Sequence, residues 1–196
     1  MFILSFLFFL TALLYSSVGF GGGSSYLALL LIWGTPYQVF PVIALCCNII
    51  VVSGNCFNFV REGDTNFKLV SPYLISSIPL AFIGGSLEIE QNTFEILLFI
   101  TLSIAGFFLL IKFKSFDNKD EIYRKIPNII SILIGGTIGF VSGIVGIGGG
   151  IFLSPILLLI RVSKAKHIAA TASIFILINS IAGIAGQITK DSILSE

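Results

Sequence analysis

The sequence has few charged residues, and they lie outside or at the edges of its long apolar runs. Lysine, arginine, aspartate and glutamate together make up 11% of the 196 residues, against roughly 25% in a soluble domain. Hydrophobic residues make up 56%, and the mean hydropathy is +1.04. Because a charge at the bilayer midplane is costly, a membrane protein keeps its charges outside its apolar runs. The composition predicts a multi-pass protein of the cell membrane, which is the inner membrane if the source is bacterial.

Other missing features exclude several classes of protein. The three cysteines, Cys46, Cys47 and Cys56, lack the C-x-x-C spacing of a metal or redox site. The net charge is only +1, and no basic surface for nucleic acid is evident. No G-K-[ST] phosphate-binding motif occurs, and no set of nucleophile, base and orienting residue stands out. We therefore expect no enzyme, no metal, no cofactor and no nucleic-acid partner.

One five-residue pattern, G-x-G-G-G, occurs twice in the chain. It spans residues 19–23 and 146–150, so the two copies are 146 − 19 = 127 residues apart. Each copy follows an apolar run of helical length and precedes a short one, 24–33 or 151–160. The spacing indicates two halves of one domain, because the units of a stacked solenoid are only roughly 20 to 50 residues long.

The lengths of the apolar runs separate full membrane spans from half-helices. A span needs about 20 apolar residues, whereas about 10 residues of helix cover only half of the hydrocarbon core. The runs that directly follow the glycines are too short to cross. We therefore predict that each glycine run breaks a helical hairpin near mid-membrane. Full spans are predicted for 41–60, 69–87, 94–111 and 169–188.

The basic residues of the loops predict the orientation of the chain. Lysine and arginine accumulate on the cytoplasmic side, which places the loops 112–125 and 161–166 inside. Counting the spans backward then places the uncharged loop 34–40 outside. The first glycine hairpin opens to the outside and the second to the inside. The predicted fold is therefore an all-α polytopic membrane protein with an inverted repeat.

This topology divides the chain into three parts. The first transmembrane repeat is expected at 1–113, a cytoplasmic basic loop at 114–126, and the second repeat at 127–196. After its hairpin, the first repeat continues through three predicted spans, whereas the second continues through one. The second repeat is therefore expected to be incomplete, either truncated or completed by a partner.

The residues around both glycine runs resemble the TauE/SafE sulfite-exporter family of membrane transporters. The resemblance lies in SVGFGGGSSYLALLL at 17–31, GIVGIGGGIFLSPILLL at 143–159 and KAKHIAATAS at 164–173. The first copy departs from the second in having Ala28 where the second has Pro155. The resemblance implies export or uptake of a sulfur-containing oxyanion or an organosulfonate.

The glycine runs are the candidate substrate site. Adjacent glycines allow positive φ and present bare N–H groups, and the start of the following half-helix adds unpaired donors and a partial positive charge. Small residues in membrane helices more often mediate packing, which is our interpretation of Gly135, Gly139 and Gly143. The candidate substrate-binding residues are Gly19, Gly21, Gly22, Gly23, Ser24, Gly146, Gly148, Gly149 and Gly150, together with Asn48, Thr171 and Ser173.

Three functions of different class follow from these observations. A secondary transporter of a small anion is favoured, with the anion and the lipid bilayer as its partners. A non-transporting membrane assembly or accessory subunit is the alternative, because the second repeat is short. A membrane-embedded enzyme is the third and least favoured. Whether the chain forms a homo-oligomer is left open.

Overall fold

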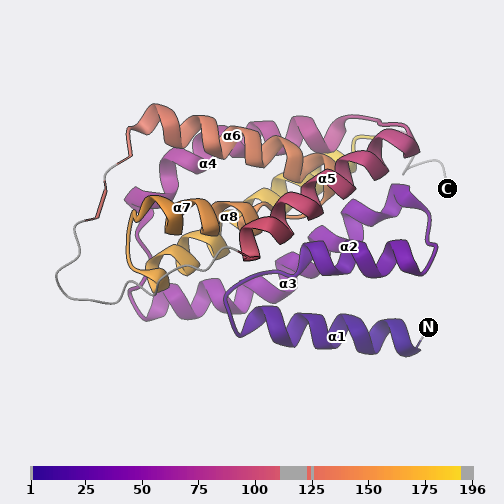
Figure 1. The fold of residues 1–196 in the computed structure, drawn as a ribbon, viewed down its shortest axis with the longest axis horizontal. Coiled ribbons are helices and arrows are strands. Elements are labelled where there is room, and N and C mark those ends of the chain that lie inside the picture. The colour runs from indigo at the N-terminus through magenta and orange to yellow at the C-terminus, as the bar shows by residue number, and fades with distance from the viewer. Residues whose placement is uncertain (1, 111–122, 125, 191–196) are drawn as a thin grey trace.

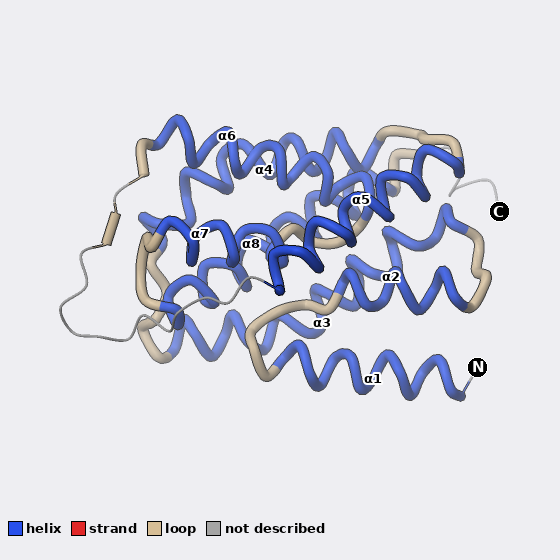
Figure 2. The backbone as a smooth tube through the Cα atoms, viewed as in Figure 1, coloured by secondary structure: helices blue, strands red, loops and turns tan. Residues whose placement is uncertain are grey.

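A computed structural model describes residues 2–110, 123–124 and 126–190. These residues form eight α-helices and one short 3-10 helix and contain no β-strand (Figure 2). The all-α fold class is therefore confirmed. The elements are α1 (Phe2–Ser16), α2 (Gly23–Ile32), η1 (Tyr37–Val39), α3 (Phe40–Arg61), α4 (Phe67–Ser86), α5 (Gln91–Leu110), α6 (Asn128–Val145), α7 (Gly150–Ile160) and α8 (Ala165–Gln187).

Most helix lengths agree with the expected spans and half-helices. Among the described residues, α3, α4, α5, α6 and α8 are long and apolar enough to cross a membrane, as expected of a multi-pass protein. Helices α2 and α7, with 10 and 11 residues, directly follow the two glycine runs and are too short to cross. Helix α6 differs from the expectation of a break near mid-membrane, because its 18 residues are themselves long enough for a span.

The two glycine-broken hairpins open toward opposite ends of the bundle. In Figure 1 the free ends of α1 and α2 lie at the right, and the free ends of α6 and α7 lie at the left. Helices α2 and α7 begin 150 − 23 = 127 residues apart, which is the spacing of the two runs. The inverted repeat, the incomplete second repeat and the division at 113 and 127 stay predictions. Most of the proposed cytoplasmic loop, 114–122 and 125, lies outside the described residues.

Helix α6 packs against α4 at backbone distance at three glycines, Gly135, Gly139 and Gly143. A Cβ atom built on Gly139 would lie 2.6 Å from the Cα and the carbonyl oxygen of Ser77. Cβ atoms on Gly135 and Gly143 would likewise meet the carbonyl oxygens of Tyr73 and Ala81. The packing role predicted for these three glycines is confirmed. Glycines every four residues therefore let the backbones of α6 and α4 approach closely.

Helix α8 lies at the centre of the bundle, and the outer helices turn apolar side chains outward. Of its residues, 14 are buried, including Phe175, Asn179 and Gln187. Large exposed apolar side chains are what lipid contact requires, because lipid tails are as apolar as leucine. The most exposed of these side chains are Phe2, Leu110, Ile50, Ile32, Phe99 and Ile129.

Polar contacts join three segments at one end of the bundle. The ammonium group of Lys166 lies 2.8 Å from a carboxylate oxygen of Glu62 and 2.7 Å from one of Asp64. The hydrogen bond from Lys166 holds the pKa of Asp64 below its ordinary value. The backbone N–H of Arg124 donates to the carbonyl of Arg161 at 3.0 Å. The α3–α4 loop, the segment before α6 and the α7–α8 loop therefore lie together, as loops on one side of a membrane would.

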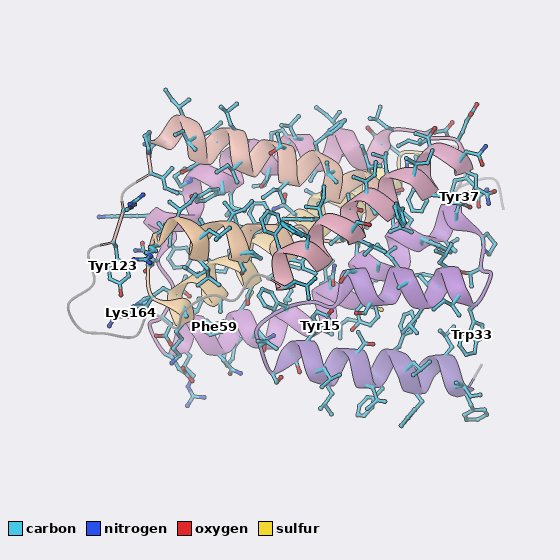
Figure 3. The ribbon with its side chains drawn as sticks, in the orientation of Figure 1. Tyr15, Trp33, Tyr37, Phe59, Tyr123 and Lys164 are labelled. Carbon is cyan, nitrogen blue, oxygen red and sulfur yellow. The ribbon has the colours of Figure 1, made fainter. Side chains whose placement is uncertain are left out.

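Cysteine labelling tests which side of the membrane each end faces. Figure 3 shows Trp33 and Tyr37 at one end of the bundle and Lys164 at the other. In a background without Cys46, Cys47 and Cys56, we expect a membrane-impermeant maleimide added outside intact cells to modify Gln38→Cys and to spare Lys164→Cys, because basic loops stay inside. Permeabilised cells should show labelling of both. Labelling of Lys164→Cys alone in intact cells would show that the orientation is the reverse of the predicted one.

Candidate functional site

Each half-helix begins at a glycine in the left-handed region. Gly22 precedes α2 with φ 81° and ψ 11°, and Gly149 precedes α7 with φ 79° and ψ −17°. Gly19 and Gly146, the first residues of the two runs, have φ 85° and 87°. A side chain in this region costs roughly 1–2 kcal/mol per residue. The requirement for glycine therefore recurs at equivalent positions of the two runs.

The two glycine runs meet around the side chain of Asn48 on α3. The Asn48 Nδ2 atom donates to the carbonyl oxygen of Ile147, in the second run, at 3.1 Å. A Cβ atom on Gly21, in the first run, would meet Asn48 Oδ1. A Cβ atom on Gly23 would lie 2.5 Å from the Ile147 oxygen and 2.8 Å from Asn48 Nδ2. The two glycine runs, far apart in the sequence, are thus in direct contact, and the Asn48 amide contacts both of them.

Helix α8 supplies polar groups to both runs. The Ser173 hydroxyl donates to the carbonyl oxygens of Gly19, in the first run, and of Ala169, one turn earlier in α8. The Ser180 hydroxyl oxygen lies 3.2 Å from the position of a Cβ on Gly148, in the second run. The oxygens Asn48 Oδ1 and Ser180 Oγ are both buried without a hydrogen-bond partner. An unpaired buried polar atom is costly, so these atoms are the first places to look for a ligand.

The predicted glycines fall into two groups by the direction in which a side chain would point. Cβ atoms on Gly21, Gly23 and Gly148 would point at the Asn48 amide. Those on Gly146, Gly149 and Gly150 would instead meet Pro41, the Ile138 and Phe175 side chains, and Ile176, respectively. Only the first group therefore borders the polar centre, whereas the second lets α6 and α7 pack against α3 and α8.

Four other predicted site residues lie in different surroundings. Ser24 is buried and lines a small cavity beside the first run. Gly19 and Gly22 shape the break through positive φ. Thr171 is also buried, but its hydroxyl donates to the His167 carbonyl one turn earlier, at 2.8 Å. The hydroxyl of Thr171 is therefore bonded within its own helix and not to a glycine run.

The sequence analysis missed three groups at this site. They are the carbonyl of Ile147, the hydroxyl of Ser180, and Tyr15, whose hydroxyl lies 3.0 Å from Ser25 Oγ. Ser180 follows Ser173 by seven residues, which places both on one helix face, so helical periodicity could have indicated it. A backbone carbonyl has no sequence signal, because its partner is set by tertiary packing.

The cavity at the junction is almost closed. Its volume is about 10 Å³, which is close to the space for one water molecule. Every residue that lines it is uncharged, and a substrate-sized anion does not fit. The lining residues are Tyr15, Phe20, Gly21, Gly22, Gly23, Ser24, Ile147, Ile151 and Ile176.

Comparisons with known proteins place the chain in a family. A profile of the family described as Sulfite exporter TauE/SafE matches residues 4–194. "Probable membrane transporter protein y4hK" of Sinorhizobium fredii (strain NBRC 101917 / NGR234) is 31% identical over 184 residues, which cover 91% of this chain and 73% of that protein. "Probable membrane transporter protein YunE" of Bacillus subtilis (strain 168) is 23% identical over 193 residues, which cover 86% and 71%. No solved structure matches significantly.

The profile match extends over both glycine hairpins and over the helices between and after them. Both relatives are described as membrane transporters, and the long apolar helices suit that environment. This chain is therefore a multi-pass membrane transporter that belongs to the TauE/SafE sulfite exporter family.

Proposed function

We propose that this transporter moves a small anion, a sulfur-containing oxyanion or an organosulfonate, and binds it where the two glycine runs meet at Asn48. The observation that carries the proposal is the contact of both runs with this one buried amide. Each run also ends at the start of a half-helix, α2 or α7. The choice of a sulfur compound rests on the family description.

The helix starts supply the attraction for an anion. Gly22 and Gly149 cap α2 and α7 and make no side-chain cap hydrogen bond. The first N–H groups of such a helix lack partners within the helix, and its N-terminus carries a partial positive charge. Transporters with discontinuous helices use half-helix N-termini in this way. Two of them next to each other favour an anionic substrate over a cation.

The neutral surroundings suit release as well as binding. The cavity lining contains no lysine or arginine, so binding rests on N–H groups and on the Asn48 amide. Such donors bind an oxyanion without the cost of burying a cationic side chain. An oxyanion with several oxygens can accept from both helix starts at once. The expected affinity is moderate, as repeated loading and unloading require.

We propose that this arrangement is a closed state of the transport cycle. Because the junction holds only about 10 Å³, an anion can enter only when the two runs separate. The hydrogen bond from Asn48 to Ile147 at 3.1 Å holds them together in this state. We propose that the hairpins move apart alternately toward the two ends of the bundle, as repeats do in alternating access.

A panel of anions tests the proposal. Purified protein is heated with sulfite, sulfate, methanesulfonate, acetate or a neutral sugar, and the ligands that raise Tm are then followed into proteoliposomes. We expect a sulfur anion to raise Tm, because a ligand at 100 times its Kd stabilises by about 2.7 kcal/mol, and to accumulate faster than in protein-free liposomes. If no anion raises Tm and no anion accumulates in the proteoliposomes, the proposed function is refuted and a non-transporting assembly is favoured.

A further inference from the structure

Helix α8 carries polar side chains along one face. Ser173, Ser180 and Gln187 follow one another at intervals of seven residues, or two helical turns, which places them in line. All three side chains are fully buried. Most other residues of this helix are alanine, glycine, isoleucine or phenylalanine. The regular spacing of buried polar groups therefore defines a polar stripe, formed by Ser173, Ser180 and Gln187.

Each member of the polar stripe faces the backbone of a glycine hairpin. Ser173 donates to the carbonyl of Gly19 in the first hairpin. Ser180 lies beside Gly148 in the second. Gln187 Nε2 donates to the carbonyl of Gly143, near the end of α6, at 2.9 Å. The stripe therefore runs past both candidate binding runs.

The polar stripe is only partly satisfied by the protein. Ser180 Oγ and Gln187 Oε1 are buried and have no hydrogen-bond partner, and the same holds for Asn48 Oδ1 beside the first run. A role limited to fastening helices together would use these atoms in interhelical hydrogen bonds. Polar atoms that stay unpaired along one line are instead suited to a solute or to water that passes them.

A cavity lies close to the Gln187 end of the polar stripe, at Lys190. This cavity measures about 290 Å³, and its lining includes Lys190, Glu88, Pro41 and Ile144. The backbone N–H of Lys190 donates to the carbonyl of Gln187 at 3.1 Å, which joins the stripe to the cavity wall. Pro41 in turn lies directly against Gly146 of the second run. The cavity wall is therefore in contact with the first residue of the second run.

We infer that the polar stripe is the translocation track of the anion. The track starts in the cavity at Lys190, passes Gln187 and Ser180 beside the Asn48 centre, and leaves past Ser173. From Ser173 to Gln187, the last residue of α8, the helix rises about 21 Å at 1.5 Å per residue, which is about two-thirds of a hydrocarbon core of about 30 Å. The inference rests on the proposed function, because it takes an anion as the solute.

Charge-selective thiol labelling tests the track in full-length protein in proteoliposomes. Ser180→Cys is introduced after Cys46, Cys47 and Cys56 are replaced by alanine. The probes are sulfonatoethyl methanethiosulfonate, which is an anion, and its trimethylammonium analogue, which is a cation. Ala182→Cys is the matched control, because it is also buried in α8 but lies about 200° around the helix.

The expected result is modification of Ser180→Cys by the anion about tenfold faster than by the cation, a preference of about 1.4 kcal/mol. Added methanesulfonate should slow the reaction, modification should block sulfate uptake, and Ala182→Cys should react with neither probe. Ser173→Cys provides the same test if Ser180→Cys does not fold. The track would be overturned, with the proposed function left standing, by either of two results. One is sulfate uptake by variants that neither probe modifies. The other is modification at equal rates by both probes. Absence of uptake of any anion by the unmutated protein would overturn the proposed function as well.

Discussion

Replacing Asn48 with leucine is expected to abolish anion uptake while the protein still inserts in the membrane. Leucine has a similar size but cannot donate to the Ile147 carbonyl, which Asn48 Nδ2 reaches at 3.1 Å. An unsatisfied buried acceptor costs about 1–3 kcal/mol, and the bond between the two runs is lost with it. Sulfate uptake into proteoliposomes should fall by more than about tenfold. A tenfold fall corresponds to a rise of about 1.4 kcal/mol in the free-energy barrier to transport.

Asn58→Leu is the matched control for this change. Asn58 lies on the same helix as Asn48 but is exposed, so its replacement removes an amide without touching the junction. Uptake by Asn58→Leu should stay near that of the unmutated protein, and both variants should be recovered from the membrane in similar amounts. Full uptake by Asn48→Leu would show that the amide at the junction has no part in transport.

Gly23→Ala should produce the second large loss. Gly23 begins α2 and has no positive φ, so alanine brings no backbone strain there. The added Cβ atom would lie 2.5 Å from the Ile147 oxygen and 2.8 Å from Asn48 Nδ2. The two runs must then move apart, which breaks the junction. Such overpacking lowers the free energy of unfolding by about 1–3 kcal/mol. We expect no measurable sulfate uptake and a lower Tm.

Gly54→Ala separates this effect from the general effect of a methyl group in a membrane helix. Gly54 lies within α3, and a Cβ atom built there would meet nothing within 4 Å. Its replacement should leave uptake and Tm unchanged or raise Tm slightly, because alanine favours helix over glycine. Equal behaviour of the Gly23 and Gly54 variants would contradict a role for close contact between the runs.

The sequence was sufficient for the membrane class, the helical segments and the family. Lipid offers no hydrogen bonds to the backbone, so apolar runs of span length must be helical. The repeat of G-x-G-G-G at a spacing of 127 residues indicated two half-helices. In the structure these half-helices begin at Gly23 and Gly150. Positive φ at Gly22 and Gly149 supplies the physical reason for glycine there. These features are local, and local patterns are readable from one chain.

Only the tertiary structure decided which residues meet. Asn48 and Ile147 are 99 residues apart and are bonded, whereas Thr171, predicted for the same site, donates within α8. Local periodicity cannot foresee this, because the partner of a buried amide depends on the rotation and depth of each helix against its neighbours. The rotation and depth of a helix are set where glycines let two backbones touch, as at Gly23 and Gly139. A glycine has no side chain to specify which backbone packs against it, so the sequence does not identify the partner.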